Sequence, residues 1–502
     1  MMKNAVVIGG GINGLVASNY LQKNNFNVTM IEKNSYVGGA CIKDKILHNN
    51  KEIYFPKGAT VLGMMQKFVF EETGLSQKIK TFYPKSPKLV YFPNDSEPTK
   101  IFQNINDLKI ELKEKWGENG NIEGFRNDEN KVIKYLQEIY KSGDSPNVNR
   151  AEKLLGKELT EIWIKGSAFN LLNRYFTSEK TKLYMGMTVT ESGPASIFDE
   201  GSAFTIPLMD SGSIFNGYWG FVKNGIWEVT EKLFDINNNL GVKNLLSTQI
   251  DNIDKVNKKI NFNGKEINYD FILFATDPKT PSLLIDDSDS LKKINKKELI
   301  GTSGKITAFF KNPVKWKKAN DKEYDTSFRF IFSNSDLYDF EKSSQNTKNN
   351  ISNYEHGYIQ IYPEGAAQRK MGNNENLDKL ILFSKNFSFN KKSKDLLNNK
   401  NEIISLLSNY IENIDDLVET KFLTPMDLNE QFYFPKGNID HMTLTKNQNF
   451  AKRTFSNNPE TKFYQYFNNE DIYYCGAGAF PCGSVAGTPG YMCSKQLIKK
   501  YS

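Results

Sequence analysis

The chain is poor in the residues that build metal sites and disulfide frameworks. Its 502 residues include three histidines and four cysteines, and the cysteines at positions 41, 475, 482 and 493 form no C-x-x-C pair. No H-x-x-H motif or Cys/His cluster appears, so the sequence predicts neither a metal site nor a disulfide scaffold. Such cysteine usage is typical of a reducing compartment, and we expect a cytoplasmic location.

Arginine and long apolar runs are scarce as well. Only six of the 65 basic residues are arginines, so the net charge of +7 rests on lysines interspersed with acidic residues. Few guanidinium forks are left to read bases or clamp phosphates, which argues against a nucleic-acid partner. No apolar run approaches 18 residues and a strand is expected from residue 5, so we expect neither a membrane span nor a signal peptide. A loose attraction of the lysines to an anionic membrane surface stays open, and no pattern assigns an oligomeric state.

Glycine, in contrast, follows a regular pattern near the N-terminus. Residues 5–8 form a short apolar run suited to a buried parallel strand, and a helix is expected over residues 12–23. At the turn into this helix and in its first turn, Gly9, Gly11 and Gly14 satisfy G-x-G-x-x-G. The first glycine allows a tight turn, the second lets the backbone approach a pyrophosphate, and the third lets helix and strand pack closely. The order of strand, glycines and helix predicts a dinucleotide-binding βαβ unit.

A carboxylate and a second glycine pair extend this fingerprint. The next strand, expected over residues 27–31, ends at Glu32, which can accept hydrogen bonds from ribose hydroxyls. Gly38 and Gly39 follow shortly afterwards. The combination of fingerprint and glycine pair favours FAD over NAD alone.

Two later segments carry related signals. A compact apolar strand over residues 269–274 ends at Ala275, and a C-terminal strand over 472–475 leads into Gly476 and a final helix ending near Lys500. Pieces about 200 residues apart cannot each form a domain, so we expect an α/β fold: one discontinuous Rossmann-type FAD-binding domain with an inserted α+β substrate domain. The expected boundaries are residues 1–73, 217–300 and 451–502 for the FAD-binding domain, and residues 74–216 and 301–450 for the substrate domain.

Four polar stretches punctuate the middle of the chain. They are rich in Asn, Lys and Ser, and this composition predicts surface loops or insertions. The stretches are residues 93–100, 116–131, 341–352 and 390–401.

With these motifs assembled, the chain resembles the FAD-dependent phytoene desaturase-like oxidoreductases. The similarity covers about half of the chain and is loosest over residues 74–216 and 311–412, which would select the substrate. It is carried by residues 6–39, 217–233, 271–278, 425–441 and 474–491.

The resemblance implies a set of FAD-binding residues. The first three glycines would meet the pyrophosphate, Glu32 the adenosine ribose, and Val485 and Ala486 the pyrimidine end of the flavin. A helix beginning there would stabilise negative charge on the reduced flavin. The complete set is Gly9, Gly11, Ile12, Asn13, Gly14, Glu32, Lys33, Gly38, Gly39, Ala40, Ile250, Ala275, Asp277, Pro278, Gly476, Ala477, Val485 and Ala486.

Other chemistry has weaker support. His441, preceded by Asp440 in a resembling segment, is the one candidate catalytic residue, as a proton-handling group near the substrate; the alternative is a structural histidine at the domain junction. Cys475 and Cys482 lie near the expected flavin edge, but without a paired thiol we favour a packing role. The sequence also departs from the family, with Lys223-Asn224-Gly225 for a Gly-Gly pair and Phe480-Pro481-Cys482-Gly483 where His-Pro-Gly-Gly is expected.

These observations predict an FAD-dependent oxidoreductase that transfers hydride between flavin N5 and a small apolar or amphipathic organic substrate, as a desaturase or dehydrogenase does. Two alternatives stay open. One is an amine oxidase-like flavoprotein, because one fold can host both chemistries. The other is a flavin-bound regulatory or interaction protein with little turnover, because the departures from the family pattern affect the flavin region.

Overall fold

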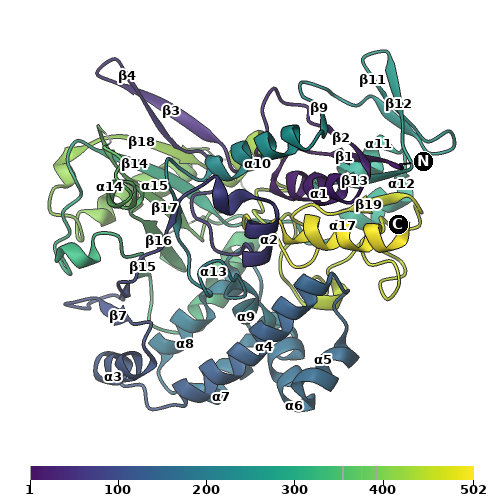
Figure 1. Cartoon of the computed structure of the whole chain (residues 1–502). Coiled ribbons are helices and arrows are strands. Elements are labelled where there is room, and N and C mark those ends of the chain that lie inside the picture. The colour runs from purple at the N-terminus through teal and green to yellow at the C-terminus, as the bar shows by residue number, and fades with distance from the viewer. Residues whose placement is uncertain (1, 353–354, 375, 390–392, 502) are drawn as a thin grey trace.

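The computed structural model of this chain describes residues 2–352, 355–374, 376–389 and 393–501. Two lobes, each built on its own sheet, lie side by side, with a layer of helices beneath them in the view of Figure 1. Both termini lie in the first lobe, the nucleotide lobe. The second lobe is called the substrate lobe.

The nucleotide lobe contains a parallel sheet drawn from distant parts of the chain. Its strands are β1 (Asn4–Ile8), β2 (Asn27–Ile31), β9 (Lys243–Leu245), β13 (Phe271–Phe274) and β19 (Ile472–Tyr474). They lie in the order β19-β13-β1-β2-β9, with Val6 between Ile272 and Thr29. The apolar runs suit strands covered on both faces. This arrangement confirms the predicted discontinuous Rossmann-type domain.

Three helices hold the pieces of this lobe together. They are α1 (Ile12–Lys23), α10 (Trp227–Asn239) and α17 (Thr488–Tyr501). The rings of Tyr20 in α1 and Tyr491 in α17 meet edge-on, with centroids 4.8 Å apart. The buried Asn237 side chain of α10 donates a hydrogen bond of 2.8 Å to the Leu15 carbonyl of α1. The N-terminal helix is therefore fixed by residues that follow it by more than 200 positions.

A small antiparallel sheet extends from the nucleotide lobe at the top of Figure 1. Its strands are β10 (Asn252–Asp254), β11 (Lys259–Phe262) and β12 (Lys265–Asn268). Ile253 lies opposite Ile260, which in turn lies opposite Ile267. The loop that precedes β10 carries Ile250 toward the carboxyl end of β2.

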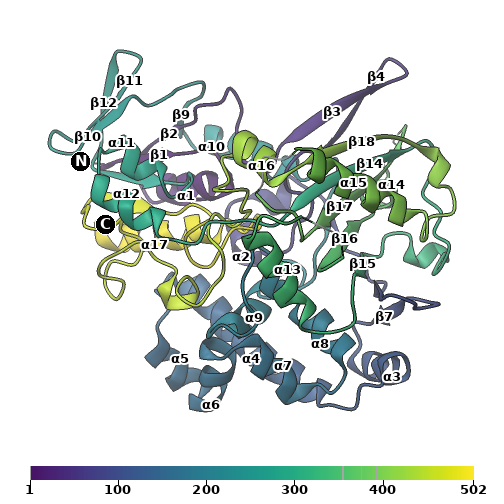
Figure 2. The same ribbon diagram turned by 180° about the vertical axis from the view of Figure 1, so that it is seen from behind.

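The substrate lobe is built on a mixed seven-stranded sheet, best followed in Figure 2. Its strands are β6 (Lys88–Tyr91), β7 (Thr99–Ile101), β14 (Gly304–Phe310), β15 (Arg329–Phe332), β16 (Tyr358–Tyr362), β17 (Asp378–Ser384) and β18 (Leu417–Leu423). The order is β18-β14-β17-β16-β15-β6-β7, antiparallel except where β6 runs parallel to β15. The sheet confirms an inserted domain of mixed α and β structure.

A hairpin from the N-terminal region packs on this second sheet. It consists of β3 (Lys43–His48) and β4 (Lys51–Pro56). The ring centroids of Phe55 and Phe309 lie 5.3 Å apart. Lys379 of β17 also donates a hydrogen bond of 2.9 Å to the Tyr54 carbonyl. The hairpin therefore ties the segment that follows the glycine fingerprint to the substrate lobe.

The helical layer includes a stretch that was predicted to be a loop. It comprises α3 (Ile105–Trp116), α4 (Ile122–Ser142), α5 (Val148–Leu155), α6 (Lys157–Leu159), α7 (Ala168–Tyr175), α8 (Glu179–Gly186) and α9 (Thr205–Met209). The prediction of a loop over residues 116–131 is wrong, because α4 begins inside it. Phe125, Val132 and Leu136 are buried at helical spacing while the polar residues face outward.

Two further loop predictions are also wrong where the structure describes them. Residues 341–352 overlap α13 (Asp339–Lys348), and residues 393–401 lie in α15 (Ser393–Leu407); residues 390–392 lie outside the described part. In α15, Ile403 and Leu407 are buried four residues apart. Polar content alone does not reveal these amphipathic helices, because their few apolar residues recur at helical spacing within polar stretches.

The remaining elements are short. They are α2 (Lys67–Glu72), β5 (Thr81–Phe82), β8 (Phe221–Val222), α11 (Thr280–Leu284), α12 (Ser288–Asn295), α14 (Glu364–Lys370) and α16 (Pro425–Phe432). Within the described ranges, no helix has the length and apolar character needed to cross a bilayer. The strands of each large sheet fall within the segments predicted for its domain, and the boundaries themselves stay predictions.

Candidate functional site

The candidate site is a cleft at the edge of the nucleotide sheet. It has a volume of about 390 Å³ and opens at the carboxyl ends of β1, β2 and β13, where Ile8, Ile31 and Ala275 line it. Ligands of open α/β sheets bind at this edge. The opposite wall comes from α16 and the residues after it, and the inner end from the loop before α17. The cleft thus lies between residues separated by more than 400 positions.

The three glycines of the G-x-G-x-x-G motif have different structural roles. Gly9 has φ +107°, and a side chain at Gly14 would place its Cβ 2.0 Å from the Gly9 carbonyl oxygen. Gly14 is therefore required for packing helix on strand, and it does not line the cleft. A Cβ on Gly11 would meet nothing nearer than the Gly39 Cα at 3.9 Å. Gly11 therefore leaves open space, as expected where a ligand approaches the backbone.

The beginning of α1 is suited to an anion. The N-cap residue Gly11 supplies no side-chain hydrogen bond, and the first turn contains no acidic residue. The first N–H groups of a helix have no partner within the helix and carry a partial positive charge. The Asn13 side-chain oxygen is buried and has no hydrogen-bond partner among the described residues. These unpaired groups fit the phosphates and hydroxyls of a dinucleotide.

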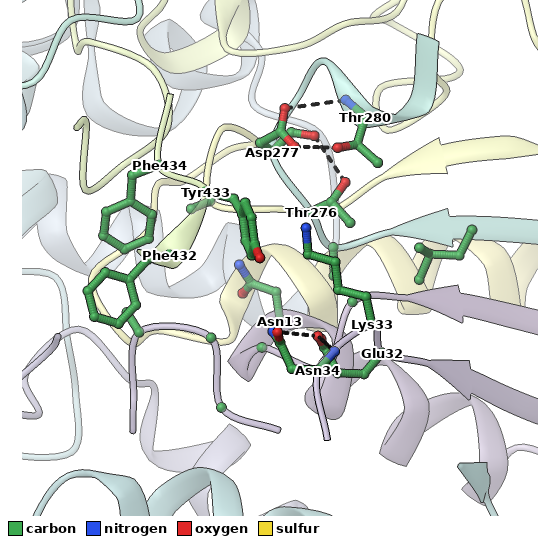
Figure 3. Close-up of a pocket in the computed structure, with 18 of the residues that line it drawn as sticks. Asn13, Glu32, Lys33, Asn34, Thr276, Asp277, Thr280, Phe432, Tyr433 and Phe434 are labelled. Carbon is green, nitrogen blue, oxygen red and sulfur yellow. Dashed lines mark hydrogen bonds between the residues drawn. The ribbon is translucent and has the colours of Figure 1, made fainter. Parts of the chain in front are cut away.

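Glu32 is held in place at the outer part of the cleft. One carboxylate oxygen accepts a hydrogen bond of 2.8 Å from the Gly10 amide, and the other accepts two bonds of 2.9 Å from the backbone and side chain of Asn34. Figure 3 shows Glu32 and Asn34 side by side. A carboxylate has about four lone-pair sites, so capacity for ribose hydroxyls remains. Ile250 also lines this part of the cleft.

The wall above β13 is organised by Asp277. Its carboxylate accepts hydrogen bonds from the Lys279 amide at 2.9 Å and from the amide and hydroxyl of Thr280. Figure 3 shows the two bonds to Thr280. Pro278 is turned away from the cleft, and its carbonyl accepts a hydrogen bond of 2.8 Å from the Tyr466 hydroxyl. Ala275 and Asp277 therefore line the site, whereas Pro278 anchors the turn.

Aromatic residues at the end of α16 form the opposite wall. Phe432, Tyr433 and Phe434 line the cleft, and Tyr433 has a left-handed backbone, with φ 58°. The Lys33 ammonium lies 3.3 Å from the centre of the Tyr433 ring, and Figure 3 shows the pair across the cleft. Among the described lining residues, Lys33 is the lone lysine or arginine. This segment carries part of the family resemblance, but a role for these aromatic residues in the cleft was not predicted from the sequence.

His441 lies on the same wall as a buried, neutral histidine. It is 8% exposed, and its ring lies 5.3 Å from that of Phe434. Burial lowers the pKa of His441 to about 4, although the nearby Asp277 acts in the opposite direction. Its Nδ1 atom has no hydrogen-bond partner among the described residues.

Arg453 fastens the segment around His441 to the C-terminal loop. The fully buried guanidinium donates hydrogen bonds to five carbonyls, among them Asp440 at 2.9 Å and Ala477 at 3.1 Å. The Asp440 carboxylate accepts a bond of 3.0 Å from the Gly483 amide, and burial raises the pKa of this carboxyl group. The wall and the loop are thereby held as one unit.

The loop that leads into α17 has an unusual backbone. Ser484 and Val485 line the cleft with φ 60° and 57°, and Gly487 has φ 67°. A left-handed conformation is rare for a β-branched residue such as Val485. Such strain occurs at functional sites when the surrounding structure enforces it. Ala486 and Gly476 do not line the cleft; a Cβ on Gly476 would come within 2.3 Å of the Thr276 carbonyl oxygen.

A buried lysine lies behind the inner end of the cleft. Lys305 of β14 donates hydrogen bonds of 2.6 Å to the carbonyls of Pro56 and Gly58. The Ala40 carbonyl in turn accepts the amide of the neighbouring Ala59 at 2.8 Å. Burial lowers the pKa of Lys305 to about 7, so this amine can exchange a proton near neutral pH.

The thiols near the site are unreactive in their surroundings. Cys41 lines the cleft, and burial raises its pKa to about 12. Burial also raises the pKa of Cys482 well above its ordinary value. These protonated thiols suit a packing role.

Most of the residues predicted to bind the cofactor meet in this cleft. Those not lining it are Gly14, Pro278, Gly476 and Ala486. Those that line it are Gly9, Gly11, Ile12, Asn13, Glu32, Lys33, Gly38, Gly39, Ala40, Ile250, Ala275, Asp277, Ala477 and Val485, together with His441. Three further residues line the cleft without having been predicted: Asn34 and Tyr36, which follow Glu32, and Thr248, which precedes Ile250. Their contact with a cofactor stays a prediction.

A parallel βαβ sheet with a free helix N-terminus, open toward a second lobe, defines a dinucleotide-binding protein of two-domain architecture. The sequence profile of the NAD(P)-binding Rossmann-like domain matches residues 7–67. The chain is 18% identical to pyridine nucleotide-disulfide oxidoreductase domain-containing protein 2 of Rattus norvegicus, across 97% of this chain and 92% of that protein. It is 24% identical to the phytoene desaturase of Neurospora crassa across 50% of this chain and 42% of the enzyme.

Solved structures show the same fold at low sequence identity. Cyclohexylamine oxidase from Brevibacterium oxydans superposes with a TM-score of 0.60 and 13% identity, across 100% of this chain and 98% of that enzyme. At this identity the match shows the fold alone. Together the comparisons confirm the predicted class, an oxidoreductase similar to the phytoene desaturases, and they agree with FAD as its cofactor.

Proposed function

We propose that this protein binds FAD in the cleft and transfers hydride between flavin N5 and a small apolar or amphipathic organic substrate, in the manner of a desaturase or dehydrogenase. The observation that carries the proposal is one cleft running from Glu32, past Gly39, to Val485 at the junction of the two lobes. It offers a ribose acceptor, a phosphate cradle and an inner end beside the substrate lobe.

The residues of the cleft fit an extended dinucleotide. Gly11 and the first turn of α1 would hold the pyrophosphate, and Lys33 would supply a counter-charge. Ala40 and Val485 would flank the flavin. The loop at Val485 leads into α17, whose positive N-terminal end favours negative charge nearby. When bound, the flavin supplies the hydride chemistry, and the protein supplies binding, orientation and electrostatics.

A glycine substitution tests the cofactor site without confusing it with folding. Gly11→Ala introduces a methyl group into open space, at a backbone φ of −74° that alanine adopts freely. We expect the apo-protein Tm to change by no more than about 3 °C, because an N-cap Gly→Ala change costs only a few tenths of a kcal/mol to about 1 kcal/mol. FAD affinity should fall by roughly tenfold or more, because the backbone no longer approaches the pyrophosphate. Normal FAD stoichiometry and affinity in this variant would refute the assigned cleft.

Flavin spectroscopy tests the reaction. Purified protein reconstituted with FAD should show flavin absorption bands, and their absence would contradict the desaturase-like and the amine oxidase-like functions alike. Anaerobic mixing with isoprenoids, lipids or amines should then bleach the bands with one of these classes. Flavin that stays oxidised with all of them favours the regulatory or interaction protein over the enzyme.

An amine oxidase-like reaction is the second candidate, and Lys305 favours it. An amine must lose a proton before it gives up hydride, and a buried lysine with a pKa of about 7 behind Ala40 is suited to receive it. With an amine substrate, bleaching should rise with pH through about 7, and Lys305→Met should remove that dependence. An unchanged pH profile in this variant argues for the desaturase-like reaction.

We also propose, as finer points, a hydrophobic substrate, a cytoplasmic location and peripheral contact with an anionic membrane. The net charge of +7 supports the membrane contact. Co-sedimentation tests the membrane contact by comparing vesicles that contain phosphatidylserine with neutral vesicles at the same salt concentration. Raised salt should then weaken the binding to the phosphatidylserine vesicles. Equal recovery with both vesicle types would contradict it.

A further inference from the structure

The longest free strand edge in the described part of the chain belongs to β18. This strand forms one end of the seven-stranded sheet and pairs there with β14 alone among the described strands; Figure 2 shows it at the outer edge of the sheet. β18 has seven residues, whereas the other three ends of the two large sheets, β7, β9 and β19, have three residues each. Short edge strands discourage further pairing, and β18 lacks this protection.

The residues of β18 are accessible along its whole length. None of the seven is buried, whereas every residue of the neighbouring β14 is buried. The side chains of Glu419 and Lys421 are 36% and 47% exposed, and they form an ion pair of 2.6 Å along the strand. Residues two positions apart on a strand lie on the same face of the sheet. This face of the edge therefore carries one negative and one positive group side by side.

The order of residues along β18 fits a second copy of the same strand. Residues 417–423 read LVETKFL, with apolar residues at both ends and opposite charges on either side of Thr420. If two copies pair antiparallel about a two-fold axis at Thr420, Glu419 of each copy lies opposite Lys421 of the other, and the apolar ends meet. A two-fold interface requires a patch that is complementary to itself. The edge of β18 meets this requirement.

A β-bulge lies beside the charged centre of the edge and leaves it regular. The register against β14 shifts between Phe309 and Phe310, which leaves Val418 without a partner in that strand. The register is regular from residue 419 to residue 423. The hairpin β3–β4 packs on one face of the sheet beside Val418 and forms no ladder with β18. The complementary charges therefore lie in undisturbed strand.

We propose that β18 is the dimerisation edge of this protein: two copies pair through antiparallel β18 strands centred on Thr420, so that two seven-stranded sheets become one. The free N–H and C=O groups of each edge then bond to the other copy and supply the affinity. The charges set direction and register, because a parallel in-register pairing, or an antiparallel one shifted by two residues, would place like charges opposite each other. This inference goes beyond the proposed function and does not depend on the cofactor.

Charge-swapped variants test this pairing directly. Glu419→Lys leaves two lysines beside Thr420, and Lys421→Glu leaves two glutamates, so each single variant places like charges opposite each other in its homodimer. The double variant Glu419→Lys/Lys421→Glu restores opposite charges. An equimolar mixture of the single variants restores them as well, because a copy with two lysines then meets a copy with two glutamates. Lys259→Glu is a control with the same charge change, since it breaks an ion pair of 2.6 Å with Glu266 in the small sheet.

Sedimentation equilibrium of the purified full chain measures the dimer dissociation constant at protein concentrations of about 1–100 μM. We expect the wild type, the Lys259→Glu control and the double variant to dimerise with similar affinity. Each single variant should dimerise roughly tenfold more weakly or worse, because two favourable cross-strand pairs become two unfavourable ones. The mixture of the single variants should form a heterodimer with wild-type affinity.

Three results would each overturn the inference. A wild-type chain that stays monomeric throughout this concentration range has no dimerisation edge. A dimer that neither single variant weakens is held by another surface. Single variants that weaken the dimer, but whose mixture does not restore it, show that the charges do not lie opposite each other in this register. The Tm of each variant reports folding separately, and FAD uptake by the wild type tests the proposed function independently.

Discussion

The two large sheets of this protein differ most in what they bury. The strands of the nucleotide sheet contain no buried charged side chain among the described residues, whereas the substrate sheet buries Lys305, Arg329, Asp378 and Lys379. The first sheet presents backbone groups and glycines to a ligand. The second brings charged side chains from distant strands into a low-dielectric interior, where each must find partners. The nucleotide lobe therefore supplies the backbone groups that fit a dinucleotide, and the substrate lobe contains the buried ionisable groups.

The largest loss of stability is expected from a substitution at Gly14 in the nucleotide lobe. A Gly14→Ala methyl group would collide with the Gly9 carbonyl oxygen at 2.0 Å, and rigid backbone cannot move aside. We expect a loss of more than about 3 kcal/mol in the free energy of unfolding, measured by urea denaturation. Gly11→Ala is the control. Similar stability of the two variants would contradict the division of tasks between these glycines.

Removing the Arg453 guanidinium, which joins the segment around His441 to the C-terminal loop, should have the next largest effect. Arg453→Met removes a guanidinium that serves five buried carbonyls, and we expect a loss of about 3 kcal/mol. Arg453→Lys keeps the charge but cannot reproduce the fork, so it should recover less than half of that stability. Urea unfolding curves measure both. Full recovery by lysine would show that charge alone matters at this position.

The pH dependence of stability tests the buried lysine of the substrate sheet, Lys305. Its pKa is about 7 in the folded protein and about 10.4 in an unfolded chain. Between these values the unfolded state binds more protons, so this residue makes stability rise with pH from about 7 to 10, by at most about 1.4 kcal/mol per pH unit. The difference in unfolding free energy between wild type and Lys305→Met should follow that rise. A flat difference over pH 7–10 would contradict the low pKa.

The smallest effect is expected at the contact between Lys33 and Tyr433. A cation–π pair near the surface contributes about 0.5–1 kcal/mol, so Tyr433→Ala should speed FAD release roughly two- to fivefold. Tyr433→Phe keeps the ring and should release FAD at the wild-type rate. Stopped-flow displacement of bound FAD measures the three rates. Equal rates for Ala and Phe would show that the contact does not retain the cofactor.

The sequence predicted the nucleotide lobe well because its signals are local. The spacing of Gly9, Gly11 and Gly14 and the apolar runs on either side follow from steric rules that act over a few residues. The same holds for Glu32, which lies at the end of its strand. Three of the four polar stretches, in contrast, were wrongly predicted as loops. Their helices depend on which face of α4 or α15 meets the core, and composition does not contain that information.

The cleft itself was predicted in part. Fourteen of the eighteen proposed cofactor residues line it, and the four exceptions are Gly14, Pro278, Gly476 and Ala486. The aromatic wall after α16 was not predicted, because nothing in the sequence around Tyr433 indicates that its ring contacts Lys33, 400 positions earlier.

The amino-acid sequence by itself determined the cofactor class and the cradle that receives it, because tight turns, close backbone approach and helix N-termini are set by local residue types. Only the tertiary structure decided the neutral state of His441, the low pKa of Lys305 and the contact of Lys33 with Tyr433. Burial and charge neighbours arise where distant segments pack, and they alone determine which of these groups can act near neutral pH.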